Sequence, residues 1–288
     1  QAAIERNVAV AMLSKAADGH RVGFEADYVS VSLLEKLREA CPDGVSLVPV
    51  SGVIEDIRLI KDNVELTRLT EAAELSVRAL DELLVAGELR AGRTEREVAA
   101  DLEYRMRVLG AERVSFDTIV ASGPNSAKPH HGAGDRVIAE RDLVTIDFGM
   151  HRLGFNSDMT RTFAIGEIGS LEHEIYEVTL AAQLAGVKAA VPGAKLADVD
   201  KACRDVIEDA GYGEYFVHST GHGVGLDVHE APSAAKTGEG TLAEGMTLTI
   251  EPGIYIPGKA GVRIEDTLII TAAAPKVITD YTKDLTVL

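Results

Sequence analysis

The sequence lacks features that mark several common classes of protein. Cysteine occurs only twice, as Cys41 and Cys203, and without CxxC spacing, so neither a zinc knuckle nor a disulfide framework is expected. No apolar run reaches the ~18 residues of a membrane-spanning helix, and there is no low-complexity segment. We therefore expect a globular, cytoplasmic protein that does not span a membrane.

Basic residues are scarce, since Lys and Arg number 29 against 46 Asp and Glu, for a formal net charge of −17. Contact with nucleic-acid phosphates or with an anionic membrane needs clustered basic side chains, so neither partner is expected. Apolar residues, by contrast, make up 46% of the 288 residues, which suffices for a sizeable core. Because the first residue is Gln1 and not Met, we expect a trimmed or partial chain.

The beginning of the chain has the pattern of a small α/β unit. Its predicted elements are helices at 8–14 and 29–40 and strands at 21–24 and 45–50. Capping residues at 61–63 then precede apolar residues at three- and four-residue steps, which predicts the long first helix of a second unit. We therefore expect two domains, 1–61 and 62–288.

Helices and strands alternate through the second domain. Thr94-Glu-Arg-Glu97 matches a capping box and predicts a helix start, and Ser170 is predicted to cap a later helix. Further strands are predicted at 215–217, 246–251 and 262–270. Paired hairpins among these segments favour an α+β domain with a mixed, largely antiparallel sheet.

Two aspartates stand alone in segments that otherwise resemble buried strands. Asp147 lies in the β-branched segment 143–148, and Asp158 precedes the Thr-rich segment 159–163 beyond a Gly-containing turn. A buried carboxylate is unfavourable unless it is paired or binds a metal, and hard divalent cations take carboxylate oxygens. The two carboxylates converge if the segments form a hairpin. Taken singly, either aspartate could be an ordinary hairpin or edge residue.

The same frame of residues recurs later in the chain. Residues 248–253 (LTIEPG) repeat 144–149 (VTIDFG) at an offset of 104, and 265–267 (EDT) repeat 158–160 (DMT) at an offset of 107. An internal duplication explains this agreement, because unrelated acidic residues would not fall into matching frames. Each half then contributes two carboxylates, and the four face one another across a pseudo-twofold axis.

Three histidines lie in a glycine-rich segment upstream of the second pair of acids: His218, His222 and His229. An imidazole beside four carboxylates suits Mn(II), Co(II) or Zn(II) better than Ca(II) or Mg(II). Two such ions can share a water and lower its pKa until hydroxide forms near neutral pH, which is the chemistry of a hydrolase. His222, between two glycines, could instead be a turn residue.

Five residues carry a resemblance to a known family: Asp147, Asp158, His222, Glu251 and Glu265. The motifs around them, GHGVGL, VHEAP, TIEPGIYIPG and GVRIEDT, resemble those of the pita-bread metallopeptidases, in the branch of Xaa-Pro dipeptidase (prolidase) and aminopeptidase P. The resemblance implies a pita-bread catalytic domain with a pseudo-twofold duplication. Residues 1–61 resemble the second half of a creatinase-type N-terminal domain, whose opening strands would be missing.

The resemblance implies two divalent metal ions, with Mn²⁺ or Co²⁺ expected and Zn²⁺ as a further possibility. Asp158 and Glu265 would bridge the two ions. Asp147 would complete the coordination of one ion, and His222 and Glu251 that of the other.

Catalytic roles follow from the same resemblance. His130 and His229 would contact the scissile carbonyl and the tetrahedral oxyanion, although His131 directly follows His130 and could take its place. Glu251, or the hydroxide beside it, would transfer the proton. Arg263 would orient the neighbouring carboxylate or bind a substrate carboxylate. Four residues are expected around the ligands as hydrogen-bond partners or packing residues: His218, Arg263, Thr160 and Thr267.

The implied function is a dinuclear exopeptidase that hydrolyses Xaa-Pro dipeptides and acts as a homodimer on short proline-containing peptides. Because the proline nitrogen carries no hydrogen, peptidases that bind a peptide N–H fail at this bond. The alternative is an aminopeptidase P that releases the first residue of longer Xaa-Pro peptides. The domain 1–61 argues against a methionine aminopeptidase. Creatinase-like enzymes and non-catalytic binding modules on this fold would lack the five ligand residues.

Overall fold

The computed structural model of the protein describes residues 8–288, and expectations for residues 1–7 lie outside this range. The chain divides into two compact units between Ile57 and Arg58. None of the helices in the described part of the chain is long and apolar enough to cross a membrane.

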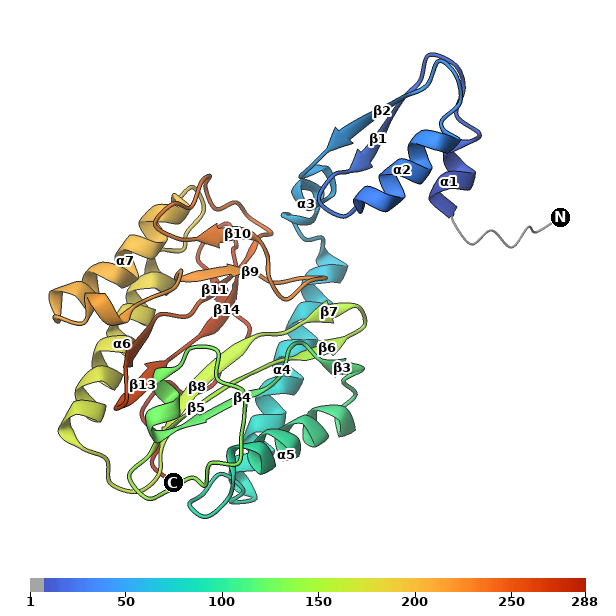
Figure 1. Ribbon diagram of the computed structural model, residues 1–288. Helices are drawn as coiled ribbons and strands as arrows, with labels where there is room; N and C mark the ends of the chain where they lie inside the picture. Colours follow the sequence, from blue (N-terminus) through green and yellow to red (C-terminus); the bar gives the residue numbers. More distant parts are fainter. Residues whose placement is uncertain (1–7) are drawn as a thin grey trace. The chain divides into compact units, whose positions relative to one another are not determined.

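The first unit is a small α/β fold (Figure 1). Its elements are α1 (Val8–Leu13), β1 (Arg21–Glu25), α2 (Val31–Ala40), β2 (Ser46–Val50) and, at the division, α3 (Val53–Arg58). The two strands pair in parallel along their whole length, and α2, capped by the Ser30 side chain, connects them. The two helices and two strands that were predicted within residues 8–50 are thus confirmed.

The second unit consists of two similar halves. The first half contains α4 (Asn63–Val85), α5 (Glu95–Val108), β3 (Arg113–Val114), β4 (Ile119–Ser122), the 3-10 helix η1 (Gly123–Ala127), β5 (Leu143–Phe148), β6 (Met150–Arg152), β7 (Phe155–Asn156) and β8 (Met159–Ala164). The second half contains α6 (Ser170–Ala189), α7 (Leu196–Asp209), the 3-10 helix η2 (Gly213–Tyr215), β9 (Gly221–Gly223), β10 (Glu230–Ala234), β11 (Thr247–Ile250), β12 (Gly253–Ile256), β13 (Ala260–Arg263), β14 (Asp266–Ile269) and β15 (Lys276–Val277).

The strand pairings repeat between the halves. In the first half β5 pairs antiparallel with β8, and in the second half β11 pairs antiparallel with β14. The two strands that carry the duplicated residues therefore pair in the same way in both halves. Every strand pairing described in this unit is antiparallel.

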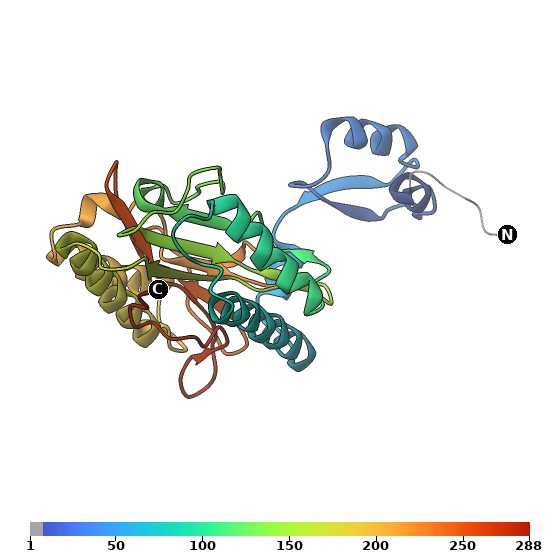
Figure 2. The ribbon, with the colours of Figure 1, turned by 90° about the horizontal axis from the view of Figure 1, so that it is seen from below.

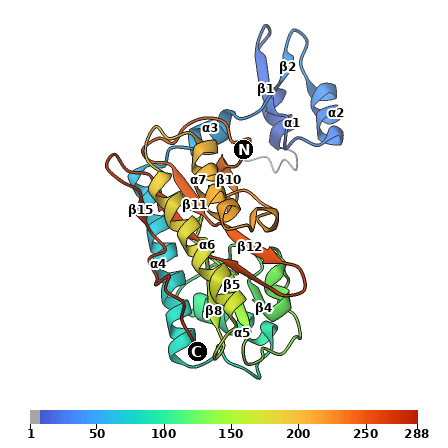
Figure 3. The ribbon, with the colours of Figure 1, turned by 90° about the vertical axis from the view of Figure 1, so that its left-hand side faces the viewer.

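Each half has its own helices and its own apolar core. Helices α4 and α5 pack beside the strands of the first half, and α6 and α7 beside those of the second (Figures 1 and 3; Figure 2 shows the strands between the helices from below). One apolar cluster joins α4 and α5 to β4, β5 and β8, and another joins α6 and α7 to β11–β14. The duplication seen in sequence is therefore also a duplication of packed structure.

Local sequence signals place the helix starts closely. Asp62 caps α4 and Thr94 caps α5, each in a complete capping box with a glutamate three residues later. Ser170, predicted to be a cap, is instead the first residue of α6, and Gly169 precedes it as the N-cap without a side-chain hydrogen bond.

Two predicted strands differ from the structure because other groups bind their backbone. Residues 215–217 form no strand, since the Arg204 guanidinium takes the carbonyls of Phe216 and His218. The expected strand 262–270 is broken between β13 and β14, where the Glu265 N–H donates to a carbonyl of β8. The break turns the Glu265 side chain toward the first half.

Candidate metal centre

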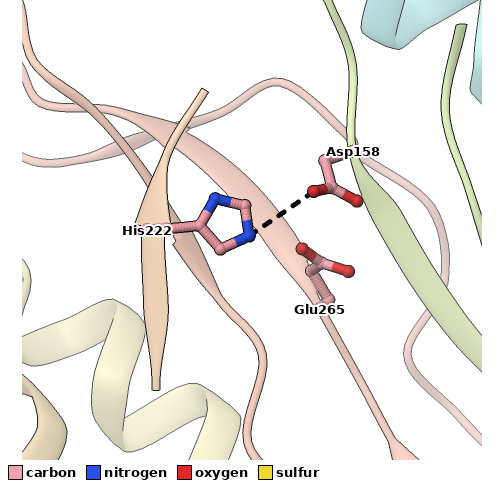
Figure 4. A group of neighbouring side chains, drawn as sticks. All are labelled: Asp158, His222 and Glu265. Atoms are coloured by element: carbon pink, nitrogen blue, oxygen red, sulfur yellow. Dashed lines mark ion pairs between the residues drawn. The ribbon is translucent and has the colours of Figure 1, made fainter. Parts of the chain in front are cut away.

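Carboxylates from both halves meet an imidazole in the middle of the second unit (Figure 4). Asp158 comes from the turn before β8, Glu265 from the break between β13 and β14, and His222 from β9. One ligand atom from each lies within 4.8 Å of the others, and His222 Nε2 is 3.6 Å from Asp158 Oδ2. These three residues therefore converge as expected from the sequence.

The other two expected ligands lie in the same site. Glu251 follows β11, and its Oε1 lies 3.2 Å from His222 Nε2 while accepting a hydrogen bond of 3.0 Å from Thr249 Oγ1. Asp147 is near the end of β5. Both line a cavity of about 510 Å³ together with Asp158 and His222.

The glycines beside His222 allow strands to approach closely, so the reading of His222 as a turn residue is wrong. A Cβ at Gly221 would lie 1.8 Å from the carbonyl oxygen of Thr249, and one at Gly223 would lie 2.2 Å from that of Ala231. His222 is thus the middle residue of β9, held between β10 and β11.

A threonine side chain from each half donates a hydrogen bond to an acidic residue of the other half. Thr160 Oγ1 donates to Glu265 Oε2 at 2.7 Å, and Thr267 Oγ1 donates to the Asp158 carbonyl oxygen at 2.7 Å. Thr160 thus binds a carboxylate, whereas Thr267 binds a backbone carbonyl. Each half orients an acid of its counterpart.

Arg263 binds Asp147 and not its neighbour Glu265. Its buried guanidinium donates to four oxygen atoms: Asp147 Oδ2 at 2.6 Å, Tyr255 Oη at 2.8 Å, Thr160 Oγ1 at 3.1 Å and the Pro129 carbonyl at 3.2 Å. No substrate carboxylate is needed to satisfy this side chain. The expectation that Arg263 orients the adjacent carboxylate directly is therefore wrong, because the fork points toward the first half.

The electrostatics of the cluster favour a bound cation. Burial and the surrounding carboxylates raise the pKa of Asp158 and of Glu265 well above their ordinary values. Burial and Glu251 also raise the pKa of Asp147, even though Arg263 opposes the shift. Burial acts in the same direction on Glu251, but the hydrogen bond and charge of His222, together with His218 and Arg263, outweigh it and lower the pKa of Glu251 to about 2.

The donor set fits two divalent ions. Within the described residues, the buried Asp147 Oδ1 and Glu265 Oε1 have no hydrogen-bond partner. Buried polar atoms normally have a hydrogen-bond partner. Bound divalent cations would interact with these two oxygen atoms and would relieve the repulsion among the four carboxylates. Carboxylate oxygens with one imidazole suit a transition ion.

The remaining histidines differ in how their rings are held. His218 Nδ1 lies 2.7 Å from the Ser219 carbonyl and Nε2 lies 2.8 Å from Tyr255 Oη, so this ring is fixed beside the site. The His229 ring centroid is 4.3 Å from that of His222. Burial lowers the pKa of both His218 and His229, which favours neutral imidazoles.

His130 and His131 both line the cavity, but only one ring is free. His131 Nε2 lies 2.7 Å from Glu95 Oε2, whereas the His130 ring has no hydrogen bond to any residue within 8–288. The geometry thus favours His130 as the residue that reaches a substrate.

Sequence reasoning missed several residues of the site. Thr249 and Tyr255 belong to the TIEPGIYIPG motif, and Thr249 also to the recurring frame 248–253, which were usable signals. Phe116, Asp117 and Ile119 line the cavity, but nothing in their local sequence marks them.

The stability of the metal-free protein is expected to fall as pH rises. Asp158 and Glu265 have folded-state pKa values above the ordinary 3.8 and 4.5, so the folded state favours their protonated forms. The stability linked to them is complete below those ordinary values and is lost as pH rises through the raised folded pKa. Thermal denaturation in chelator across about pH 4–8 should show this loss, and saturating Mn²⁺ should flatten it. An equal slope in Asp158→Asn would contradict the assignment.

Comparison with known proteins defines the class. The metallopeptidase family M24 matches residues 67–272, and the creatinase/prolidase N-terminal domain matches residues 4–60. The chain belongs to metallopeptidase family M24. It is a metal-dependent peptidase, hence a hydrolase, and the predicted pita-bread fold with a preceding creatinase-type domain is confirmed.

Individual relatives are similar over most of the chain. An Xaa-Pro dipeptidase of Pyrococcus furiosus is 44% identical over 257 residues, which are 89% of this chain and 73% of that protein. The structure of an Xaa-Pro dipeptidase from Bacillus anthracis is similar with a TM-score of 0.91 and 45% identity, covering 93% of this chain and 75% of that one. An X-Pro aminopeptidase structure from Thermotoga maritima has a TM-score of 0.89 and 38% identity, with the same coverage of 93% and 75%.

Proposed function

We propose that the protein is an Xaa-Pro dipeptidase, a prolidase-like exopeptidase that hydrolyses the bond before proline in dipeptides. The observation that carries the proposal is the convergence of the expected ligand residues: four of them line one cavity of about 510 Å³, a size that suits a small peptide, and the fifth, Glu265, has a carboxylate oxygen within 4.8 Å of ligand atoms of Asp158 and His222. The similarity to the dipeptidases of Pyrococcus furiosus and Bacillus anthracis supports the choice of substrate.

Two divalent ions, Mn²⁺ or Co²⁺ in preference to Zn²⁺, are assigned to the site. The residues that would hold them are Asp147, Asp158, His222, Glu251 and Glu265. When bound, the ions would activate a water for attack and polarise the scissile carbonyl.

The chain's own residues supply positioning and proton transfer. His130 and His229 face the cavity and would donate hydrogen bonds to the carbonyl oxygen as it gains negative charge. Glu251 would accept a proton from the attacking water and deliver it to the proline nitrogen as that leaves. His218 and Arg263 are fixed by Tyr255, and they would hold Asp147 and the cavity wall in place.

The organisation around the site belongs to the same proposal. We assign residues 62–288 to the catalytic domain and 1–61 to a creatinase-type domain, and we propose a homodimer in the cytoplasm. Unpaired Cys41 and Cys203 are consistent with a reducing compartment. Light scattering after size-exclusion chromatography tests the dimer.

Hydrolysis of a panel of peptides is the direct test. With Mn²⁺ or Co²⁺ bound, the protein is expected to cleave an Xaa-Pro dipeptide at least tenfold faster than an Xaa-Pro-Yaa tripeptide, and to leave a Met-Ala-Yaa peptide intact. Preference for the tripeptide would establish the alternative aminopeptidase activity, which the similarity to the Thermotoga maritima structure favours. Cleavage of the Met peptide alone would refute both.

A further inference from the structure

Glu95 is a fully buried acid that neither the metal centre nor the proposed mechanism uses. It is the first residue of α5 and has 0% of its surface exposed. Its carboxylate accepts hydrogen bonds from five donors: Ser122 N at 2.8 Å, Ser122 Oγ at 2.7 Å, Asn125 Nδ2 at 3.0 Å, His131 Nε2 at 2.7 Å and Gly134 N at 3.3 Å. A buried carboxylate with this many hydrogen bonds holds the segments that supply the donors rigidly together.

Helix capping does not account for this acid. The start of α5 is already capped by Thr94 and Glu97, which exchange hydrogen bonds in a capping box. Glu95 instead points away from its own helix toward β4, η1 and the segment 128–134. Burial alone would raise its pKa, but hydrogen bonds from Asn125, His131 and Ser122 lower it, so Glu95 stays anionic at neutral pH.

The segment that Glu95 binds carries two of the histidines that line the cavity, His130 and His131. Residues 128–134 form neither helix nor strand, yet Pro129, His130, His131 and Gly132 line the site. Within the described residues, the hydrogen bonds that hold it are few. They come from the Glu95 carboxylate, from the Arg96 N–H to the Gly134 carbonyl at 3.0 Å, from the Lys128 N–H and Nζ to Asn125, and from Arg263 to the Pro129 carbonyl.

We propose that Glu95 is a positioning residue for the peptidase reaction, which acts through His131 to hold the His130 ring toward the metal centre. Because the carboxylate only accepts, His131 must carry its proton on Nε2 and is unavailable to the substrate. The backbone on both sides of His130 is then held by hydrogen bonds, at Pro129 and at His131, and this directs the His130 ring into the cavity. This proposal rests on the proposed function.

A double-mutant cycle tests the coupling. Glu95→Gln and His131→Gln are each expected to lower kcat on an Xaa-Pro dipeptide by about 10- to 100-fold, the loss that small misplacement of a catalytic group causes, with KM changed less than twofold. In a His130→Ala background, either substitution should lower kcat by less than twofold. The matched control is Glu97→Gln, an acid in the same helical turn without contact to the segment, and it should change kcat less than twofold.

A purely structural role would give a different result. The proposal would be overturned if the loss in kcat from Glu95→Gln or His131→Gln multiplied with the loss from His130→Ala. It would also be overturned if both single variants kept the wild-type kcat. If Glu95→Gln does not fold, His131→Gln carries the test alone, since it leaves the bonds to Ser122 and Asn125 intact.

The outcome remains readable if the substrate assignment is wrong. Should the metal-loaded wild type cleave no Xaa-Pro dipeptide, the proposed function fails, and backbone hydrogen exchange then tests Glu95 independently. Exchange of the Lys128 and Gly134 N–H groups, which are bound to Asn125 and Glu95, should quicken at least tenfold in Glu95→Gln and His131→Gln but not in Glu97→Gln. Unchanged exchange in the first two variants would overturn the positioning role.

Discussion

Replacing Asp158 by Asn is expected to abolish hydrolysis and yet make the metal-free protein more stable than the wild type. Asp158 is only 4% exposed and lies among Glu265, Asp147 and Glu251, which raise its pKa. Removing its charge relieves this repulsion, for a gain on the order of 1 kcal/mol. The same change replaces one carboxylate oxygen by an amide NH2 group, which cannot bind a cation, and removes the negative charge, so metal retention fails and kcat falls by at least about 1,000-fold.

The measurements separate these two effects. Metal content after gel filtration and turnover of an Xaa-Pro dipeptide report the lost ligand, whereas urea unfolding in chelator reports the gain in stability. Asp227→Asn is a suitable control, because Asp227 lies between His222 and His229 in sequence but its side chain is 60% exposed and pairs with Arg58. A variant at Asp158 that keeps two metals and normal turnover would exclude a bridging role.

The sequence was informative wherever function and fold follow from local or repeated patterns. The recurrence of an apolar-Thr-Ile-acid-x-Gly frame predicted two matching hairpins, and the structure has them as β5 with β8 and β11 with β14. Capping boxes located α4 and α5 because a cap depends on neighbours in the chain. The five ligand residues belong to such frames and motifs, which is why the convergence of the whole set could be expected.

The sequence-based predictions were wrong where a side chain that is distant in the sequence forms the hydrogen bonds expected from neighbouring backbone. Residues 215–217 look like a strand, but Arg204 binds the carbonyls of Phe216 and of the following His218, and a contact between residues distant in sequence leaves no periodic signal. Glu95 was unremarkable inside its capping-box motif, since the motif does not tell which way its second residue points. Arg263 was assigned to Glu265 from proximity in sequence, whereas strand geometry turns it toward Asp147.

Replacing Arg263 by Met is expected to cause a larger loss of stability than any other single change considered. The Arg263 side chain is 4% exposed, and its ion pair with Asp147 at 2.6 Å crosses between the halves. Without the guanidinium, the Asp147 carboxylate has no cation, and its Oδ1 already lacks a hydrogen-bond partner. Breaking a buried pair in this way costs about 3–5 kcal/mol, which urea unfolding of the metal-free protein would measure.

Bound metal should reduce that loss, because a divalent ion at Asp147 replaces the missing positive charge. The double variant Arg263→Met with Asp147→Asn should regain most of the metal-free stability, since the uncompensated charge is gone, but it should not regain activity. Tyr255→Phe removes the hydrogen bonds to Arg263 and His218 and leaves the ion pair, so it should cost only about 2 kcal/mol. If Arg263→Met and Tyr255→Phe cost the same, the ion pair is not what holds Asp147, and the two halves are joined at this point by packing alone.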